Sequence, residues 1–237
     1  MGLERKVIII TGTSSGIGLD LAKHYSDLGL QVVGASRRDS QFSHPNYTHM
    51  NVDVTKELEV RKFVTEIRKI FGRVDILVCN AGVVQSSLLA SVTPLDIAKE
   101  FIDTHFIGTF LVCREVSKIM IKQKFGRIIN VSTIGVPLHL AGTAAYSASK
   151  AAVVEFTKVL ANELAPLGIT CNVLSPSLFL SEGATKMGSP WAEKLLKLQT
   201  ITRMANARDF SNAISFFASD ESDLITGQVL NLALVSP

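Results

Sequence analysis

The 237-residue sequence predicts an α/β protein built on a doubly wound parallel sheet of about seven strands, with helices on both faces. Short, continuous apolar runs such as 7–11 and 74–79 are typical of strands that are buried on both faces of a parallel sheet. Helical patterns alternate with these runs along the chain. No linker rich in Pro, Gly or Ser interrupts the alternation, so we expect one domain over residues 1–237, with a single-domain Rossmann fold.

Each element has a local reason. The apolar run at 7–11 ends at a glycine-rich turn, and apolar residues then follow at helical spacing from Leu19 to Tyr25. The helix at 57–71 is amphipathic and is closed by Gly72. Its expected buried residues are Leu58, Phe63, Ile67 and Ile70. The expected strands are 7–11, 29–36, 47–54, 74–79, 126–131, 169–174 and 228–234, and the further helices are 94–124, 145–164 and 209–219.

Composition excludes several classes of protein. Hydrophobic residues make up 47% of the chain and charged residues 19%, which favours a buried globular core over disorder. The net charge of +3 is small and the basic residues are scattered, so we expect no nucleic-acid surface. Cys79, Cys113 and Cys171 lie in apolar segments and are expected to be reduced core thiols, with no metal site. The sequence shows no signal peptide and no membrane span, which predicts a cytoplasmic protein.

The glycine-rich turn predicts a dinucleotide site. Gly12, Gly16 and Gly18 stand between a buried strand and a helix, where glycines let a pyrophosphate approach the helix N-terminus. The spacing is G-x-x-x-G-x-G rather than G-x-G-x-x-G, and a purely structural turn is the alternative. About 20 residues later, no acid follows the second strand, and Arg37 and Arg38 stand there instead. Guanidinium groups at this position favour NADP(H) over NAD(H), the alternative being that they only solvate a loop.

The spacing of Tyr146 and Lys150 predicts a general acid for catalysis. They stand four residues apart in a helical segment, so both project from one helical face. A fixed cation near a phenol lowers its pKa from about 10 toward the range that acid-base catalysis needs. The alternative is a half-buried tyrosine and a surface lysine.

Taken with Asn80-Ala81-Gly82, the glycine-rich turn and the Tyr146-x-x-x-Lys150 pair resemble the motifs of classical short-chain dehydrogenases/reductases, in the same order and over essentially the whole chain. The chain is most similar to the branch of 3-oxoacyl carrier-protein reductases and related ketone reductases. The resemblance implies that Tyr146 protonates a carbonyl oxygen as the NADPH hydride reaches its carbon, and that Lys150 lowers the tyrosine pKa and holds the nicotinamide ribose. It assigns the cofactor to Gly12, Ser14, Ser15, Gly16, Ile17, Gly18, Arg37, Arg38, Asp53, Val54, Asn80, Ala81, Gly82, Tyr146, Lys150, Pro176 and Ser181.

The chain departs from the family pattern at several positions, of which Thr133, His105 and Ser177 concern the reaction site. Thr133 stands where the family has a serine that hydrogen-bonds the substrate oxygen, and Ser132 just before it is the alternative. His105 replaces an asparagine that anchors a water for proton relay. A neutral imidazole can hold such a water, and repulsion by Lys150 should keep its pKa low, so both a working and a blocked relay remain open. Ser177 replaces a glycine near the nicotinamide.

The resemblance also implies partners. We expect a small-molecule carbonyl substrate, selected by a lid at about 181–203 that contains Gly183, Gly188, Pro190 and Trp191. The apolar helices 94–124 and 145–164 are expected to pack into a homodimer or homotetramer. The expected activity is NADPH-dependent reduction of a 3-oxoacyl thioester or of a small or alicyclic ketone. A catalytically weakened NADP(H)-binding regulator or scaffold is the main alternative, and an NAD-linked alcohol oxidiser is a further one.

Overall fold

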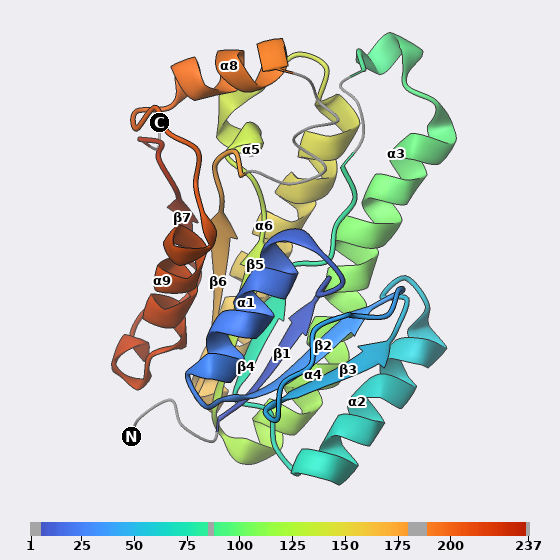
Figure 1. The fold of residues 1–237 in the computed structure, drawn as a ribbon, viewed down its shortest axis with the longest axis vertical. Helices are drawn as coiled ribbons and strands as arrows, with labels where there is room; N and C mark the ends of the chain where they lie inside the picture. The colour runs from blue at the N-terminus through green and yellow to red at the C-terminus, as the bar shows by residue number, and fades with distance from the viewer. Residues whose placement is uncertain (1–5, 85–87, 180–188, 236–237) are drawn as a thin grey trace.

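A computed structural model of the chain describes residues 6–84, 88–179 and 189–235, without the side chains of 189–191 (Figure 1). Its core is a seven-stranded parallel sheet with the strand order β3-β2-β1-β4-β5-β6-β7, which confirms the predicted fold class. The strands are β1 Val7–Thr11, β2 Gln31–Ser36, β3 Tyr47–Asn51, β4 Ile76–Cys79, β5 Gly126–Val131, β6 Ile169–Ser175 and β7 Val229–Asn231.

Helices cover both faces of the sheet. Figure 1 shows α1 in front of the strands and α4 and α6 behind them. The helices are α1 Gly16–Asp27, α2 Glu57–Phe71, α3 Leu95–Phe101, the π-helix η2 Ile102–Ile107, α4 Gly108–Gln123, α5 Gly135–Leu138, α6 Ala144–Leu164, α8 Ser189–Leu198 and α9 Ala207–Ala218. Short 3-10 turns lie at η1 Ala90–Val92, η3 Ala165–Leu167 and η4 Asp220–Ser222.

Two apolar cores lie on opposite faces of the sheet because successive side chains of a strand alternate. In β1, Ile8 and Ile10 face α1 and α9, whereas Ile9 faces α2, α4 and α6. β1 and β4 are neighbours in the sheet, and the chain continues from β1 to β2 on one side of this pair and from β4 to β5 on the other. The loops after these two strands therefore diverge at the carboxyl edge, which is where open α/β sheets bind their ligands.

Several predicted details were wrong. In α2, Leu58 and Ile70 are 71% and 54% exposed. The face of α2 that packs on the sheet does not include Leu58, and Ile70 lies in the last turn, beyond the buried part of that face. The buried residues are Val60, Phe63, Val64 and Ile67. The strand predicted at 47–54 ends at Asn51, and the one predicted at 228–234 covers only Val229–Asn231.

The helix predicted at 94–124 is divided by the π-helical segment η2. Such wide turns are rare and occur frequently at functional sites. Here the segment carries His105 into the interior, toward α6. Among the residues that the structure describes, no helix combines the length and apolar character needed to cross a membrane.

Candidate cofactor and active site

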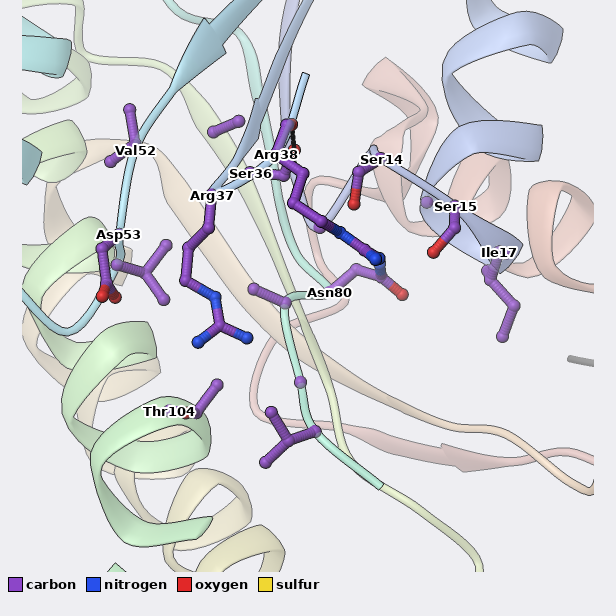
Figure 2. Close-up of a pocket in the computed structure, with 18 of the residues that line it drawn as sticks. Ser14, Ser15, Ile17, Ser36, Arg37, Arg38, Val52, Asp53, Asn80 and Thr104 are labelled. Carbon is purple, nitrogen blue, oxygen red and sulfur yellow. Dashed lines mark hydrogen bonds between the residues drawn. The ribbon is translucent and has the colours of Figure 1, made fainter. Parts of the chain in front are cut away.

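A pocket of about 710 Å³ opens at the carboxyl edge of the sheet (Figure 2). It is bounded by the loops after β1, β2, β3 and β4 and by the end of α3. Of the residues assigned to the cofactor from the sequence, those that line it are Gly12, Ser14, Ser15, Gly16, Ile17, Gly18, Arg37, Arg38, Asp53, Val54, Asn80, Ala81 and Gly82. The structure thus brings together thirteen residues from four segments of the chain.

Sequence reasoning missed other residues of this pocket: Ala35, Ser36, Val52, Val83, Val84, Glu100 and Thr104. Ser36, Val52 and Val83 are direct neighbours of assigned positions, and Ala35 and Val84 lie two positions from them, so their place along the chain was a usable signal. Glu100 and Thr104 come from α3 and η2, and nothing in their local sequence indicates that this helix passes the pocket.

The glycine-rich turn is closely packed against its neighbours. Gly12 has φ +80, and a Cβ on Gly18 would collide with the Gly12 carbonyl oxygen, so both positions need glycine. Thr11 ties the turn to the loop after β4, because its Oγ1 accepts from the N–H groups of Asn80 at 3.0 Å and Ala81 at 2.9 Å. The side chain of Ser15, the N-cap residue of α1, makes no capping hydrogen bond among the described residues. The first N–H groups of α1 therefore remain available to an anion at the pocket edge.

Arg37 and Arg38 are exposed at the end of β2. In Figure 2 the Arg37 side chain extends into the pocket between Asp53 and Asn80, and the Arg38 side chain extends toward Ser14. Together they place two positive charges on one side of the pocket. The hydroxyl of Ser36 donates to the Arg38 carbonyl at 2.7 Å.

A smaller pocket of about 160 Å³ adjoins the first, and both include Ile17 and Val84 in their lining. Its polar groups are Tyr146, at the start of α6, Ser132 and Thr133 after β5, Thr143, and Ser177 after β6. Its other residues are mostly apolar: Ile134, Gly135, Leu140, Pro176, Leu178, Phe179 and Leu195. Ser181 and residues 180–188 of the predicted lid lie outside the described residues.

The phenol of Tyr146 is half-buried beside Thr133. Burial raises the pKa of Tyr146, and a hydrogen bond with the Thr133 side chain acts in the opposite direction. The sequence predicted a lowered pKa, and that direction was wrong because desolvation of the phenolate outweighs the hydrogen bond. Ser132 is engaged elsewhere, since its hydroxyl donates to the Lys150 carbonyl at 3.2 Å.

Lys150 is only 5% exposed, which excludes the reading of a surface lysine. Its Nζ donates to the Val131 carbonyl at 2.9 Å. Burial lowers the pKa of Lys150 to about 8, with a smaller opposing interaction from Cys79. The ammonium is therefore held in the interior, one helical turn beyond Tyr146.

His105 is 1% exposed and uses both ring nitrogens within the protein. Nδ1 lies 2.8 Å from Ser149 Oγ, and Nε2 lies 3.1 Å from both the N–H and the carbonyl of Val83. The ring stacks on Phe101 and meets Tyr146 edge-on, with centroids 5.6 Å and 5.4 Å away. Burial first, and then the Lys150 charge, lower the pKa of His105 to about 2. The expected low pKa is confirmed, and the imidazole is neutral at working pH.

The three cysteines are buried thiols, as predicted, and Cys79 Sγ lies 3.8 Å from Cys113 Sγ. Their side chains pack inside the core that faces α2, α4 and α6. Within the ranges that the structure describes, no cluster of His, Cys, Asp and Glu has the arrangement of a metal site.

Comparison with known proteins agrees with this geometry. Residues 6–191 match the family model described as short chain dehydrogenase. The 3-oxoacyl-[acyl-carrier-protein] reductases of Escherichia coli K12 and Vibrio cholerae are each 31% identical to the chain, over 98% of it and 97% of their own length.

Solved structures give the same result. The 3-ketoacyl-(acyl-carrier-protein) reductase of Brucella melitensis, complexed with NADH, has a TM-score of 0.91 at 28% identity and covers 98% of each chain. An actinorhodin polyketide ketoreductase with NADPH has a TM-score of 0.87 at 25% identity, over 97% of this chain and 96% of its own. Because the family model covers well over half of residues 1–237 and the relatives align nearly end to end, the chain belongs to the short-chain dehydrogenase family.

Proposed function

We propose that this protein reduces a ketone to a secondary alcohol with NADPH, with Tyr146 as the proton donor. The observation that carries the proposal is the half-buried phenol of Tyr146, which faces Thr133 in a pocket that adjoins the larger pocket lined by the glycine-rich turn. Ketone reduction needs such an acid beside the reacting carbonyl. Relatives named as 3-oxoacyl carrier-protein reductases and a polyketide ketoreductase support the reaction class.

The residues present fit a nicotinamide dinucleotide. The uncapped N-terminus of α1 and the close-packed turn at Gly12 and Gly18 suit a pyrophosphate. Arg37 and Arg38 suit a ribose 2′-phosphate, which favours NADP(H), although relatives with NADH and with NADPH are both known. In the smaller pocket, the buried Ser177 hydroxyl has no hydrogen-bond partner among the described residues. Bound NADPH would supply the hydride that is added to the carbonyl carbon.

Each polar group of the smaller pocket then has a role. The phenol of Tyr146 is protonated at neutral pH, so Oη has a proton to give to the carbonyl oxygen, and the hydrogen bond with Thr133 favours that transfer because it lowers the tyrosine pKa against the effect of burial. The Thr133 hydroxyl polarises the same oxygen, and we prefer it to Ser132 because the Ser132 hydroxyl already donates to Lys150. Lys150 would supply positive charge to Tyr146 and a hydrogen-bond donor to the nicotinamide ribose, and Pro176 and Ser181 would hold the carboxamide.

For His105 we favour positioning over proton transfer. A group with a pKa of about 2 accepts a proton too weakly to carry one at neutral pH. Its ring instead connects Val83, in the loop beside the cofactor pocket, to Ser149 on α6. The hydroxyl of Ser149 donates to the Tyr146 carbonyl at 2.7 Å, so two hydrogen bonds connect the imidazole to the backbone of the acid.

The substrate and assembly follow from the lining and the outer surface. The described lining of the smaller pocket has no cation or carboxylate, which suits an uncharged keto group carried by a thioester or a compact ring. Leu95 on α3, Ile102 on η2 and Val159 on α6 expose apolar surface, which supports self-association into a dimer or tetramer.

The decisive experiment is Tyr146→Phe. We expect carbonyl-dependent NADPH oxidation to fall by roughly a thousandfold, because the proton donor is lost, while NADPH binding by fluorescence titration stays nearly unchanged. Tyr25→Phe is the matched control, since Tyr25 is a buried tyrosine whose hydroxyl donates to the Ser211 carbonyl on the α9 side. Turnover like that of the unmodified protein in Tyr146→Phe would end the assignment. NADPH binding without oxidation of any ketone or acyl thioester would favour a regulatory role instead.

A further inference from the structure

A hydrogen-bonded chain of side chains on β3 connects the glycine-rich turn to the arginine turn, and the proposed reaction does not use it. Tyr47 and His49 lie two residues apart on one face of β3, opposite Val32 and Gly34 of β2. The Tyr47 hydroxyl lies 3.1 Å from Thr13 Oγ1 and 2.9 Å from His49 Nδ1, and its single proton can be donated to only one of these two atoms at a time. His49 Nε2 lies 3.0 Å from the carbonyl oxygen of Arg38. The chain thus runs from Thr13 to the backbone of Arg38.

The direction of the last contact follows from chemistry. A carbonyl oxygen has no proton to give, so His49 Nε2 must be the donor and Arg38 the acceptor. Ser36 Oγ donates to the same oxygen at 2.7 Å. A third hydrogen bond holds Asp39, the residue after Arg38, because Asn51 Nδ2 donates to Asp39 Oδ1 at 2.6 Å. The turn after β2 is therefore held from β3 by His49 and Asn51.

The sheet makes room for this chain at Gly34. A Cβ added to Gly34 would collide with the Tyr47 hydroxyl and would lie 2.5 Å from Thr13 Oγ1. Glycine in the middle of a strand weakens it, and such a residue often marks a close approach of neighbouring groups. The two hydroxyl groups occupy the space that a side chain at Gly34 would fill, so the contact is built into the sheet.

The turn that is held carries the two exposed arginines of the cofactor pocket. Long arginine side chains lose conformational freedom when they bind a phosphate, and a preorganised backbone lowers that cost. We propose that Tyr47 and His49 are positioning residues for recognition of the ribose 2′-phosphate, because they hold the turn of Arg37 and Arg38 against the glycine-rich turn. The inference rests on the proposed preference for NADP(H).

The test compares two nucleotides that differ only in the 2′-phosphate, adenosine 2′,5′-bisphosphate and adenosine 5′-monophosphate, by isothermal titration calorimetry. We expect Tyr47→Phe and His49→Leu to weaken binding of the bisphosphate roughly threefold to tenfold, the effect of one lost hydrogen bond, with binding of the monophosphate unchanged. His49→Gln retains an N–H donor and should recover most of the loss. In turnover, the KM for NADPH should rise at constant kcat, and Tyr25→Phe should change neither nucleotide's binding.

The outcomes separate this inference from the proposed cofactor preference. If the unmodified protein favours the bisphosphate and Arg37→Ala abolishes that preference, while Tyr47→Phe and His49→Leu retain it, the positioning role is wrong and the preference stands. If the unmodified protein binds both nucleotides equally, the preference is wrong and the positioning role falls with it. Equal weakening of both nucleotides in Tyr47→Phe and His49→Leu would show a purely structural role and would also overturn the inference.

Discussion

The two adjoining pockets hold their polar groups in different ways. In the larger pocket, the positive charge is carried by the exposed Arg37 and Arg38, and the start of α1 adds backbone N–H groups that no Ser15 cap occupies. Around Tyr146, by contrast, Lys150 and His105 are buried and bonded to other groups of the protein, and burial shifts their pKa values. An exposed charge interacts through solvent and is screened by salt, whereas a buried group depends on its immediate neighbours. Changes in the first pocket should therefore alter cofactor affinity, and changes in the second should alter the reacting step.

After Tyr146→Phe, the largest effect that separates the pockets is expected for Lys150→Met. Loss of the buried ammonium should lower kcat by roughly a hundredfold or more, because Tyr146 loses its neighbouring charge and the ribose loses a donor. Lys150 has a pKa of about 8, so the ammonium is present below that pH and is lost above it. The activity of the unmodified protein should therefore fall as pH rises through about 8. Steady-state pH profiles of both proteins check this, and a profile with the same alkaline limb in the variant would contradict it.

Thr133→Val should have the next largest effect. It keeps the shape of the side chain and removes the hydroxyl, so we expect kcat to fall about a hundredfold, as for loss of one donor to a developing oxyanion. Thr133→Ser restores the hydroxyl and should recover most of the activity. A larger loss in Ser132→Ala than in Thr133→Val would transfer the polarising role to Ser132.

Arg37→Ala should change only the affinity for NADPH. We expect the KM for NADPH to rise roughly tenfold, because a charged hydrogen bond to phosphate is lost, with kcat and the KM for NADH unchanged. Added salt should weaken NADPH binding less in the variant than in the unmodified protein, since one screened charge has been removed. A fall in kcat without a change in KM would contradict the division between the two pockets.

The smallest effect concerns His105. Its pKa of about 2 means that no proton is gained or lost between about pH 5 and pH 8. The pH profile of kcat/KM for the unmodified protein should consequently have no acid limb near pH 6.5 that is caused by His105. The profile of His105→Asn should therefore have the same shape in this range. The appearance of such a limb would show that the imidazole titrates during turnover, and it would restore the proton relay as an explanation.

Much of the fold could be predicted because its signals are local. Buried parallel strands appear as continuous apolar runs, and β1 and β5 begin and end as expected. Errors arose where a local pattern competes with the shape of the whole molecule. Leu58 is apolar and lies in a correctly bounded helix, yet the sheet contacts a different stripe, and the position of that stripe depends on how α2 docks.

The amino-acid sequence by itself determined the fold class, the glycine-rich turn after β1 and the placement of Tyr146 and Lys150 on one helical face. These features depend on glycine placement and helical spacing, which act within a few residues. Only the tertiary structure decided which groups those residues meet. His105 lies 44 positions from Ser149, and Thr13 lies 34 positions from Tyr47. Whether such groups touch depends on how the helices and strands pack, and the direction of each pKa shift depends in turn on the burial that packing creates.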